Sequence, residues 1–477
     1  MISLLLLVPL AGMLISIFLP ARLSKYWAAA VSAATALLSV QLLRTGATAE
    51  RMPWIPSLGV DYHVAADGIS LLMLVLTTVM TLLAILASFE SVKDRVKEFY
   101  ALLLLLESAM LGVFVAQDFV LFFVFFEFSL VPMYFLIGLW GGERRLYAAI
   151  KFFLYTLSGS VFLLLGIIVL YLKSGARTFD AATLLAASLD PVTAQWVFWA
   201  FFLAFAIKVP MFPLHTWLPD AHTEAPTAGS VILAGVMLKM GTYGFLRFSL
   251  PLLPQAGHAR EIVTVLGVLS IIAILYGALV SLMQKDWKRL VAYSSVSHLG
   301  FCTLGLFSLN ASGISGSVLQ QVNHGISTGL LFLIVGIVYE RRHTRVIADF
   351  GGLAHAMPNM SVIFAIAMLS SAGLPLLNGF VGEFAILNGA YQANALWAYW
   401  SVPGVVLGAA YLLWLYQRTM LGPAQEVNAR LQDLTVREWL TVLPLVAWAI
   451  SIGVYPKPYF DLIAPGVKAA LEALHRS

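Results

Sequence analysis

The sequence predicts an all-α, polytopic membrane protein of about 14 transmembrane helices, and three observations lead to this prediction. Of its 477 residues, 60% are apolar and only 11% are charged, which places the chain in a lipid bilayer rather than in water. The apolar residues form long continuous runs, and a run of about 20 apolar residues spans the hydrocarbon core as a helix. These runs lack the ten-residue alternation of a membrane β-barrel, so helices are the remaining choice.

Counting such runs gives fourteen spans in a single membrane domain, residues 1–477. The first run has no basic segment before it and no small-residue cleavage site after it, so we interpret it as a span rather than a removed signal peptide. Residues 456–477, after the last span, predict a short amphipathic helix on the membrane surface. The predicted spans are residues 2–19, 27–43, 69–88, 98–115, 118–140, 149–172, 195–214, 226–247, 262–283, 287–307, 317–340, 361–389, 397–420 and 437–455.

The distribution of the 28 Lys and Arg residues predicts the orientation. Loops after odd-numbered spans hold 17 of them, Lys288 included, the opposite side holds 9, and the remaining 2, Lys208 and Lys239, belong to no loop. Because cytoplasmic loops are enriched in Lys and Arg, both termini are expected on the non-cytoplasmic side of a bacterial-type cytoplasmic (inner) membrane. The basic residues therefore serve as topology signals, and no nucleic-acid partner is expected.

Two interruptions of the apolar runs predict an inverted repeat. Pro210 and Pro213 break span 7, because proline removes a backbone donor, and AGLPLLNG, residues 372–379, breaks span 12. The second break comes five spans after the first, and a repeat with an odd number of spans reverses its orientation in the membrane. We expect a first repeat at residues 98–247, helices 4–8, and a second repeat at residues 262–420, helices 9–13.

Ionisable residues inside the spans are the candidate functional residues. A charge at mid-membrane costs at least about 2.5 to 3.5 kcal/mol, so such a residue faces protein or water and marks an ion route by default. The alternatives are a structural ion pair for the glutamates, snorkelling for the lysines, and ordinary interhelical hydrogen bonds for the histidines, which otherwise relay protons near neutral pH. Gly241 and Gly244 are expected to loosen one of these helices and to admit water. The candidates for proton translocation are Glu127, Lys208, Lys239, His298, His324 and Glu383.

A second group of polar residues surrounds the break in span 7. His215 and His222 flank the sequence WLPD. Either they line a water path, or Asp220 and His222 cap the start of span 8. Lys151, at the start of span 6, completes this group.

The chain carries no signature of a redox cofactor or a metal site of its own. Its single cysteine, Cys302, excludes internal disulfides, a four-cysteine iron-sulfur cluster and the usual cysteine-rich zinc site. The sequence contains neither a G-x-G-x-x-G nor a P-loop pattern. Any nucleotide or redox chemistry is therefore expected in a partner.

Four passages resemble the antiporter-like, proton-pumping membrane subunits of NADH-quinone oxidoreductase, respiratory complex I. The resemblance implies that Glu127 and Lys208 form a charged pair at the cytoplasmic half-channel, and that Lys239 is the central lysine. Glu383 corresponds to the acidic residue of span 12; sister types L and N generally carry lysine there, so it favours the M type. The passages are FFVFFEFSLVPMYFLIGLWGGERRLYAAIKFFLYTLSGS (122–160), AFAIKVPMFPLHTWLPDAHTEAPTAGSVILAGVMLKMGTYGFLR (204–247), KDWKRLVAYSSVSHLGF (285–301) and GLPLLNGFVGEF (373–384).

The resemblance also implies a function and partners. It implies a proton-translocating subunit driven by electron transfer from NADH to quinone in partner subunits, where FMN, iron-sulfur clusters and quinone are expected. The sister subunits L and N are the expected neighbours. The expected proton route runs from the cytoplasm to Lys208, then to Lys239, through water and the histidines to Glu383, and out. The alternatives are a subunit of a multisubunit sodium/proton antiporter or energy-converting hydrogenase, and a scaffold that pumps nothing.

Overall fold

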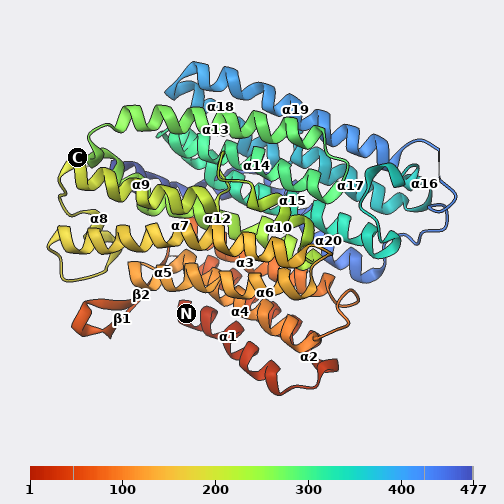
Figure 1. Ribbon diagram of the computed structural model, residues 1–477, viewed down its shortest axis with the longest axis horizontal. Coiled ribbons are helices and arrows are strands. Elements are labelled where there is room, and N and C mark those ends of the chain that lie inside the picture. Colours follow the sequence, from red (N-terminus) through yellow and green to blue (C-terminus); the bar gives the residue numbers. More distant parts are fainter. Residues whose placement is uncertain (47, 424, 475–477) are drawn as a thin grey trace.

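The computed structural model of the protein describes residues 1–46, 48–423 and 425–474, and most of them are helical. The long helices lie side by side, roughly along the longest axis of the molecule (Figure 1). In this described part, twelve helices are long and apolar enough to cross a membrane, and two shorter apolar helices, Ile2–Phe18 and Pro358–Ser371, accompany them. The prediction of a helical polytopic protein is confirmed.

Each of the fourteen predicted spans overlaps at least one helix, with boundaries that differ by a few residues. The helices up to the first break and just beyond it are α1 (Ile2–Phe18), α2 (Ala21–Thr45), α3 (Gly68–Ala87), α4 (Val96–Val115), α5 (Phe119–Phe128), α6 (Leu130–Trp140), α7 (Arg145–Ser174), α8 (Ala181–Leu185), α9 (Pro191–Lys208) and α10 (Trp217–Glu224). One continuous helical stretch follows, made of α11 (Thr227–Ile232), the π turn η2 (Leu233–Met237), α12 (Leu238–Gly244), the π turn η3 (Phe245–Ser249) and the 3-10 segment η4 (Leu250–Ala256). The remaining helices are α13 (Ala259–Leu282), α14 (Trp287–Phe307), α15 (Ala311–Arg342), α16 (Leu353–Ala356), α17 (Pro358–Ser371), α18 (Asn378–Ala393), α19 (Ala395–Met420), α20 (Val436–Val454) and α21 (Lys457–Leu474).

The two predicted breaks are present, after α9 and after α17, and they share one backbone geometry. At the first break, the N–H of Met211 donates to the carbonyl of Ala206 at 2.8 Å. At the second, the N–H of Leu374 donates to the carbonyl of Leu369 at 3.0 Å. Each of these bonds spans five residues and joins the second residue after the C-cap to the third residue before it, which is the closing bond of a Schellman motif at a helix C-terminus.

Two local features were not predicted. The strands β1 (Thr48–Ile55) and β2 (Val60–Ala66) form an antiparallel hairpin at one end of the bundle (Figure 1). The first strand, TAERMPWI, exposes most of its side chains, so it lacks the clean alternation by which a strand is recognised in a sequence. The second feature is the division of span 5 into α5 and α6 at Ser129, directly beyond Glu127.

Two short backbone pairings secure connecting segments in the same way. Asp118 pairs antiparallel with Asp180, and Asp286 pairs antiparallel with Val346. Asp118 and Asp286 are also the N-caps of α5 and α14, and each accepts a hydrogen bond from the first turn of its helix. The helix α8, which follows Asp180, and the helix α16, which follows Val346, lie at opposite ends of the bundle (Figure 1). The combination of an N-capping aspartate and a short backbone pairing is therefore found at both ends of the bundle.

The helix α21 covers most of the predicted amphipathic tail. It buries Ile463, Gly466 and Val467, and it packs against α3, α15 and η4. Its opposite side is exposed and carries an ion pair between Lys457 and Asp461 at 2.5 Å. Residues 475–477 of the predicted tail lie outside the described residues.

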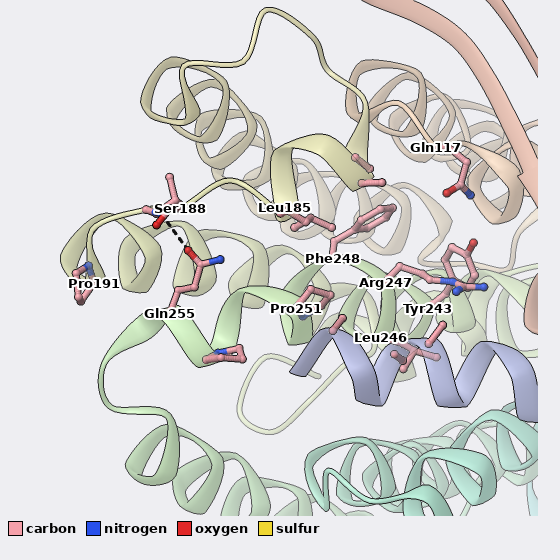
Figure 2. Close-up of a pocket in the computed structure, with 18 of the residues that line it drawn as sticks. Gln117, Leu185, Ser188, Pro191, Tyr243, Leu246, Arg247, Phe248, Pro251 and Gln255 are labelled. Atoms are coloured by element: carbon pink, nitrogen blue, oxygen red, sulfur yellow. Dashed lines mark hydrogen bonds between the residues drawn. The ribbon is translucent and has the colours of Figure 1, made fainter. Parts of the chain in front are cut away.

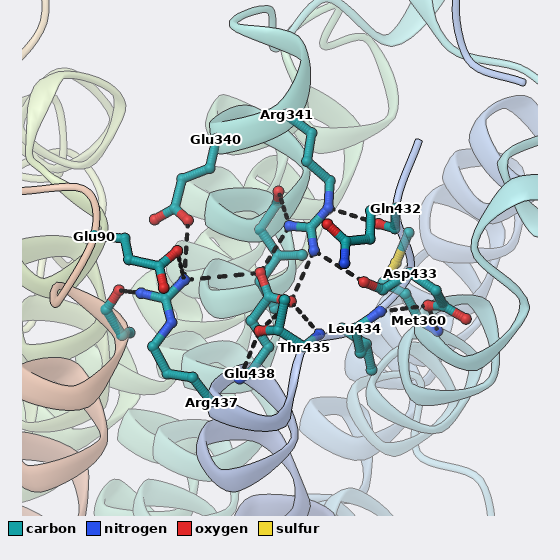
Figure 3. Close-up of polar contacts among 12 residues, drawn as sticks. Glu90, Glu340, Arg341, Met360, Gln432, Asp433, Leu434, Thr435, Arg437 and Glu438 are labelled. Atoms are coloured by element: carbon teal, nitrogen blue, oxygen red, sulfur yellow. Dashed lines mark hydrogen bonds and ion pairs between the residues drawn. The ribbon is translucent and has the colours of Figure 1, made fainter. Parts of the chain in front are cut away.

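A network of charged side chains fastens the end of the bundle near α16 (Figure 3). Arg341 on α15 donates to both carboxylate oxygens of Glu438 on α20, at 2.7 and 2.8 Å. Arg437 lies 3.3 Å from carboxylate oxygens of both Glu90 and Glu340. The network thus joins α15, α20 and the connection between α3 and α4.

Replacing Arg341 by alanine is expected to destabilise this end of the protein. The Glu438 side chain is only 4% exposed, and removing one partner of a buried ion pair typically costs about 3 to 5 kcal/mol because the other charge remains buried. We expect a lower temperature of thermal aggregation for the purified assembly. Replacing the exposed Arg430 by alanine is the control, and an equal effect of both substitutions would contradict this assignment.

Candidate proton-translocation site

Four of the predicted translocation residues form a continuous line inside the bundle. The Nζ of Lys239 lies 2.7 Å from Nδ1 of His324. The ring of His324 lies 5.9 Å, centroid to centroid, from that of His298, and Nδ1 of His298 lies 3.1 Å from Oε1 of Glu383. These side chains come from α12, α15, α14 and α18, and all four are at most 5% exposed. The fold therefore brings together residues that are far apart in the sequence.

Lys239 lies at the start of α12, directly after the π turn η2. Its ammonium also donates to the carbonyl of Ala234, inside that turn. One turn beyond the lysine, the hydroxyl of Thr242 donates to Oε1 of Gln321 at 2.7 Å, which fixes α12 against α15. A π turn adds a residue to a helix and is frequent at functional sites, and here it presents a backbone acceptor to the buried lysine.

Glu383 is held by residues on both sides of the second break. Besides His298, its Oε1 accepts a hydrogen bond from Nε2 of Gln320 at 3.1 Å. The other ring nitrogen of His298 lies 3.1 Å from the hydroxyl of Ser371, the last residue of α17. Gly373 has a φ of +79°, and a Cβ there would lie 2.9 Å from Oε2 of Glu383. Only glycine satisfies both the backbone conformation and the space at this position.

Glu127 and Lys208, the charged pair that the resemblance implies, lie close enough to interact but are not in direct contact. Lys208 is 2% exposed, its Nζ lies 4.8 Å from the centroid of the Phe126 ring, and among the described residues neither this Nζ nor Oε1 of Glu127 has a hydrogen-bond partner. The two groups are close enough for their charges to interact through space. The pair is therefore coupled electrostatically without direct contact.

The two glycines after Lys239 face α9 at close range. A Cβ on Gly241 would lie 2.6 Å from a methyl group of Val209 and 2.9 Å from the carbonyl oxygen of Phe205. A Cβ on Gly244 would lie 2.4 Å from the Phe205 ring. The glycines let α12 pack directly on the broken end of α9, so this contact is dry.

The second group of predicted residues is placed around α10. Lys151 on α7 and Asp220 on α10 form an ion pair at 2.7 Å, and His215 packs against Tyr276 with 5.0 Å between ring centroids. The alternative that Asp220 and His222 cap the start of span 8 is wrong. The N-cap of α11 is Pro226, and no side chain caps that helix. His222 is fully buried and stacks on Phe332 at 4.8 Å.

Two buried ionisable residues were missed as site candidates. Lys288 was counted among the loop residues, but it is the second residue of α14 and only 7% exposed, and its ammonium donates to the carbonyl of Ala225. Glu107 lies inside α4, is fully buried, and accepts a hydrogen bond from Ser32 at 3.1 Å. Glu107 interrupts an apolar run and could have been found by the rule that identified Glu127, whereas the burial of Lys288 depends on packing.

The part of the chain that the structure describes contains no group of three His, Cys, Asp or Glu side chains arranged to hold a metal ion. Cys302 is buried and free. A pocket of about 890 Å³ opens elsewhere, between α8, η4 and α21. Figure 2 shows Arg247, Tyr243 and Gln255 at this pocket. It is separate from the line between Lys239 and Glu383, because none of those four residues lines it.

A helical bundle with two broken helices and an interior line of ionisable side chains defines the class of polytopic, antiporter-type membrane proteins. The family profile described as "NADH:quinone oxidoreductase/Mrp antiporter, TM" matches residues 116–408. NADH-quinone oxidoreductase subunit M of Rhodobacter capsulatus is 47% identical over 440 residues, covering 89% of this chain and 85% of that protein. The chain belongs to the NADH:quinone oxidoreductase/Mrp antiporter family.

Solved structures have the same fold. A chain of respiratory complex I from Thermus thermophilus, solved with bound NADH, matches with a TM-score of 0.93 and 35% identity, covering 99% of this chain and 100% of that one. A chain of the Mrp complex from Dietzia sp. matches with a TM-score of 0.86 and 24% identity, covering 99% of this chain and 52% of that one. The predicted family and helical architecture are thereby confirmed.

Proposed function

We propose that this chain is a proton-translocating, antiporter-like subunit of NADH:quinone oxidoreductase, of the M type. The observation that carries the proposal is the buried line from Lys239 through His324 and His298 to Glu383. The near full-length similarity to subunit M of Rhodobacter capsulatus favours this assembly over a sodium/proton antiporter, for which the Mrp chain supports the fold alone. The electron transfer, with FMN, iron-sulfur clusters and quinone, takes place in partner subunits, among which we expect the sister subunits L and N.

The translocation works by changes of charge on buried Glu and Lys side chains. Burial disfavours the charged form of such a group, and a nearby opposite charge favours it. Moving one proton against about 150 to 200 mV requires about 3.5 to 4.6 kcal/mol, which corresponds to a roughly 400- to 2,500-fold change in proton affinity. A buried group that loses a neighbouring opposite charge is left to desolvation, which changes proton affinity by up to about 1,000- to 100,000-fold and so covers a change of this size. A charge shift at Glu127 therefore suffices to release a proton from Lys208.

The route we propose ends at Glu383. Lys239 passes its proton through His324, which it contacts at Nδ1, to His298, whose ring lies 5.9 Å away and whose Nδ1 faces Glu383. Glu383 holds the proton beside the second break, where the helix is interrupted. Release of this proton from Glu383 to the outer side returns the four residues to their starting protonation states.

The route is enclosed by two repeats, at residues 98–247 and 262–420. The matched pairings of Asp118 with Asp180 and of Asp286 with Val346 support an inverted relation, because they occupy opposite ends of the bundle. The common hydrogen-bond pattern at the two breaks supports the same relation. In this arrangement the α16 end faces the cytoplasm and the N-terminus lies on the other side of the bacterial inner membrane.

The proposal is tested on the purified assembly in proteoliposomes. We expect NADH oxidation by added quinone to acidify one side of the vesicle membrane, with the same amplitude in the presence and absence of sodium, and a protonophore to abolish the gradient. Flavin and iron-sulfur centres should copurify with this chain. An all-membrane assembly without these centres, or pumping that requires sodium, would favour the antiporter alternative.

A further inference from the structure

Two pockets at the end of the bundle that carries the hairpin and α8 meet at Arg247, the last residue of predicted span 8. The larger pocket, of about 890 Å³, lies between α8, η4 and α21 (Figure 2), and a smaller one, of about 330 Å³, lies beside β1 and β2. Among the described residues, Gln117 and Arg247 line both pockets. This end is the outer one in the orientation proposed above, so water of the outer side reaches Arg247 from two directions.

Asp67 and Tyr243 hold the Arg247 side chain at this position. The guanidinium forms an ion pair with Asp67, the N-cap of α3, and lies 5.3 Å from the centroid of the Tyr243 ring. The Arg247 side chain is 20% exposed, but its Nε is buried and has no hydrogen-bond partner within the described residues. Buried donors are almost always bonded to water where the protein offers no acceptor. The charge therefore lies at the boundary between the water of the pockets and the interior of the bundle.

The interior behind Arg247 leads along α12 to Lys239. Tyr243 lines the larger pocket and lies four residues after Lys239, a spacing that places both on one face of the helix with a rise of about 6 Å between them. The hydroxyl of Tyr243 donates its one hydrogen to the carbonyl of Phe114 at 2.9 Å and accepts a hydrogen bond from Ser70 at 3.1 Å. A backbone carbonyl passes no proton on, so these bonds do not continue toward Lys239. One helical turn thus separates the lysine from a pocket that opens to the outer side.

We propose that Arg247 is an electrostatic barrier that keeps protons of the outer side from returning directly to Lys239. The barrier rests on the proposed function, since it matters only if Lys239 carries a proton on its way to Glu383. A guanidinium does not give up its proton in proteins, so Arg247 relays none, and its positive charge repels a hydronium ion that enters either pocket. A fixed arginine excludes protons and cations from membrane pores in the same way. Of the ion pair, only Arg247 lines the larger pocket, so this pocket meets the positive charge directly.

The barrier is tested by the passive proton leak of proteoliposomes that contain the assembled complex and no NADH. A potassium diffusion potential set with valinomycin draws protons inward, and a trapped pH-sensitive dye reports the rate. We expect Arg247→Gln to raise the leak at least roughly tenfold, because a unit charge within about 10 Å of a path through protein shifts the energy of a proton by more than the ~1.4 kcal/mol that corresponds to this factor.

Two matched variants accompany this measurement. Arg247→Lys keeps the positive charge at the base of both pockets, so we expect its leak to stay near that of the unmodified complex. Arg177→Gln removes an exposed arginine from the connection between α7 and α8, at the same end of the bundle, and should leave the leak unchanged.

A second substitution shows whether the leak passes over Lys239. A merely structural defect at the end of α12 would admit protons whether or not residue 239 is a lysine. We expect the combination of Lys239→Ala with Arg247→Gln to return the leak to the level of the unmodified complex, because the path then lacks its proton-binding group. During NADH oxidation, Arg247→Gln alone should lower the number of protons moved per NADH while oxidation continues.

A further variant keeps the test decisive if Arg247→Gln does not assemble, since it leaves the carboxylate of Asp67 without its partner. Asp67→Asn combined with Arg247→Gln leaves no unpaired charge, and we expect it to leak as well, because the positive charge is gone. A normal leak in an assembled complex that lacks Arg247 would overturn the barrier, and so would a leak that persists without Lys239. Failure of the proposed function would appear instead as normal pumping by the Lys239→Ala single variant.

Discussion

Replacing Lys239 by alanine is expected to abolish redox-driven proton pumping by the assembled complex. The substitution removes the only ionisable group on α12 that contacts His324, so the line to Glu383 loses its first member. In proteoliposomes the NADH-driven pH gradient is expected to fall to the level given by leak alone, and coupled NADH oxidation to fall with it. The gradient is followed with a pH-sensitive dye, and assembly is checked on native gels.

Two further variants separate proton release from charge at this position. Lys239→Arg keeps a positive charge, but the guanidinium does not give up its proton in proteins, so we expect this variant to assemble and to pump no better than Lys239→Ala. Lys285→Ala, which removes an exposed lysine, should pump like the unmodified complex. Near-normal pumping by a fully assembled Lys239→Ala complex would remove Lys239 from the route.

Replacing Glu127 by glutamine is expected to abolish coupled activity with little effect on assembly. Glutamine keeps the size and the hydrogen-bonding ability of the side chain, but it cannot carry the negative charge that acts on Lys208. Because the two side chains make no contact ion pair, a role in merely fastening α5 to α9 explains this glutamate poorly. The measurement is the number of protons moved per NADH oxidised, together with the rate of oxidation.

The matched control is Glu107→Gln, at a second buried glutamate. Glu107 bonds Ser32 on α2, away from the line between Lys239 and Glu383, so its substitution should leave the proton-to-NADH ratio unchanged. Unchanged turnover and ratio in the Glu127→Gln complex would instead support the structural interpretation of Glu127.

The buried ionisable residues and the helix breaks could be predicted because a single residue makes each of them visible in the sequence. A lysine that no loop accounts for, such as Lys239, stands out against an apolar run because burying a charge is costly. Prolines and glycines likewise mark a break, as at residues 372–379, because they alter the backbone directly. These signals are local, so they need no knowledge of the neighbouring helices.

The parts that were missed depend on which helix packs on which. Lys288 follows a loop and resembles a topology signal, and only the contact of α14 with α10 buries it. In the sequence, Gly241 suggests a loosened helix. In the structure, residues at the end of α9 fill the space beside it.

The π turn before Lys239 sets the azimuth of that side chain. An α-helix advances by about 100° per residue, and the turn Leu233–Met237 accommodates one residue more than a regular turn would. If the same residues formed a regular α-helix instead, everything beyond the turn would rotate by about 100°, so that Lys239 would point away from His324 although no residue had changed. The aim of the lysine toward His324 therefore depends on the wide turn as much as on the residues that make the contact.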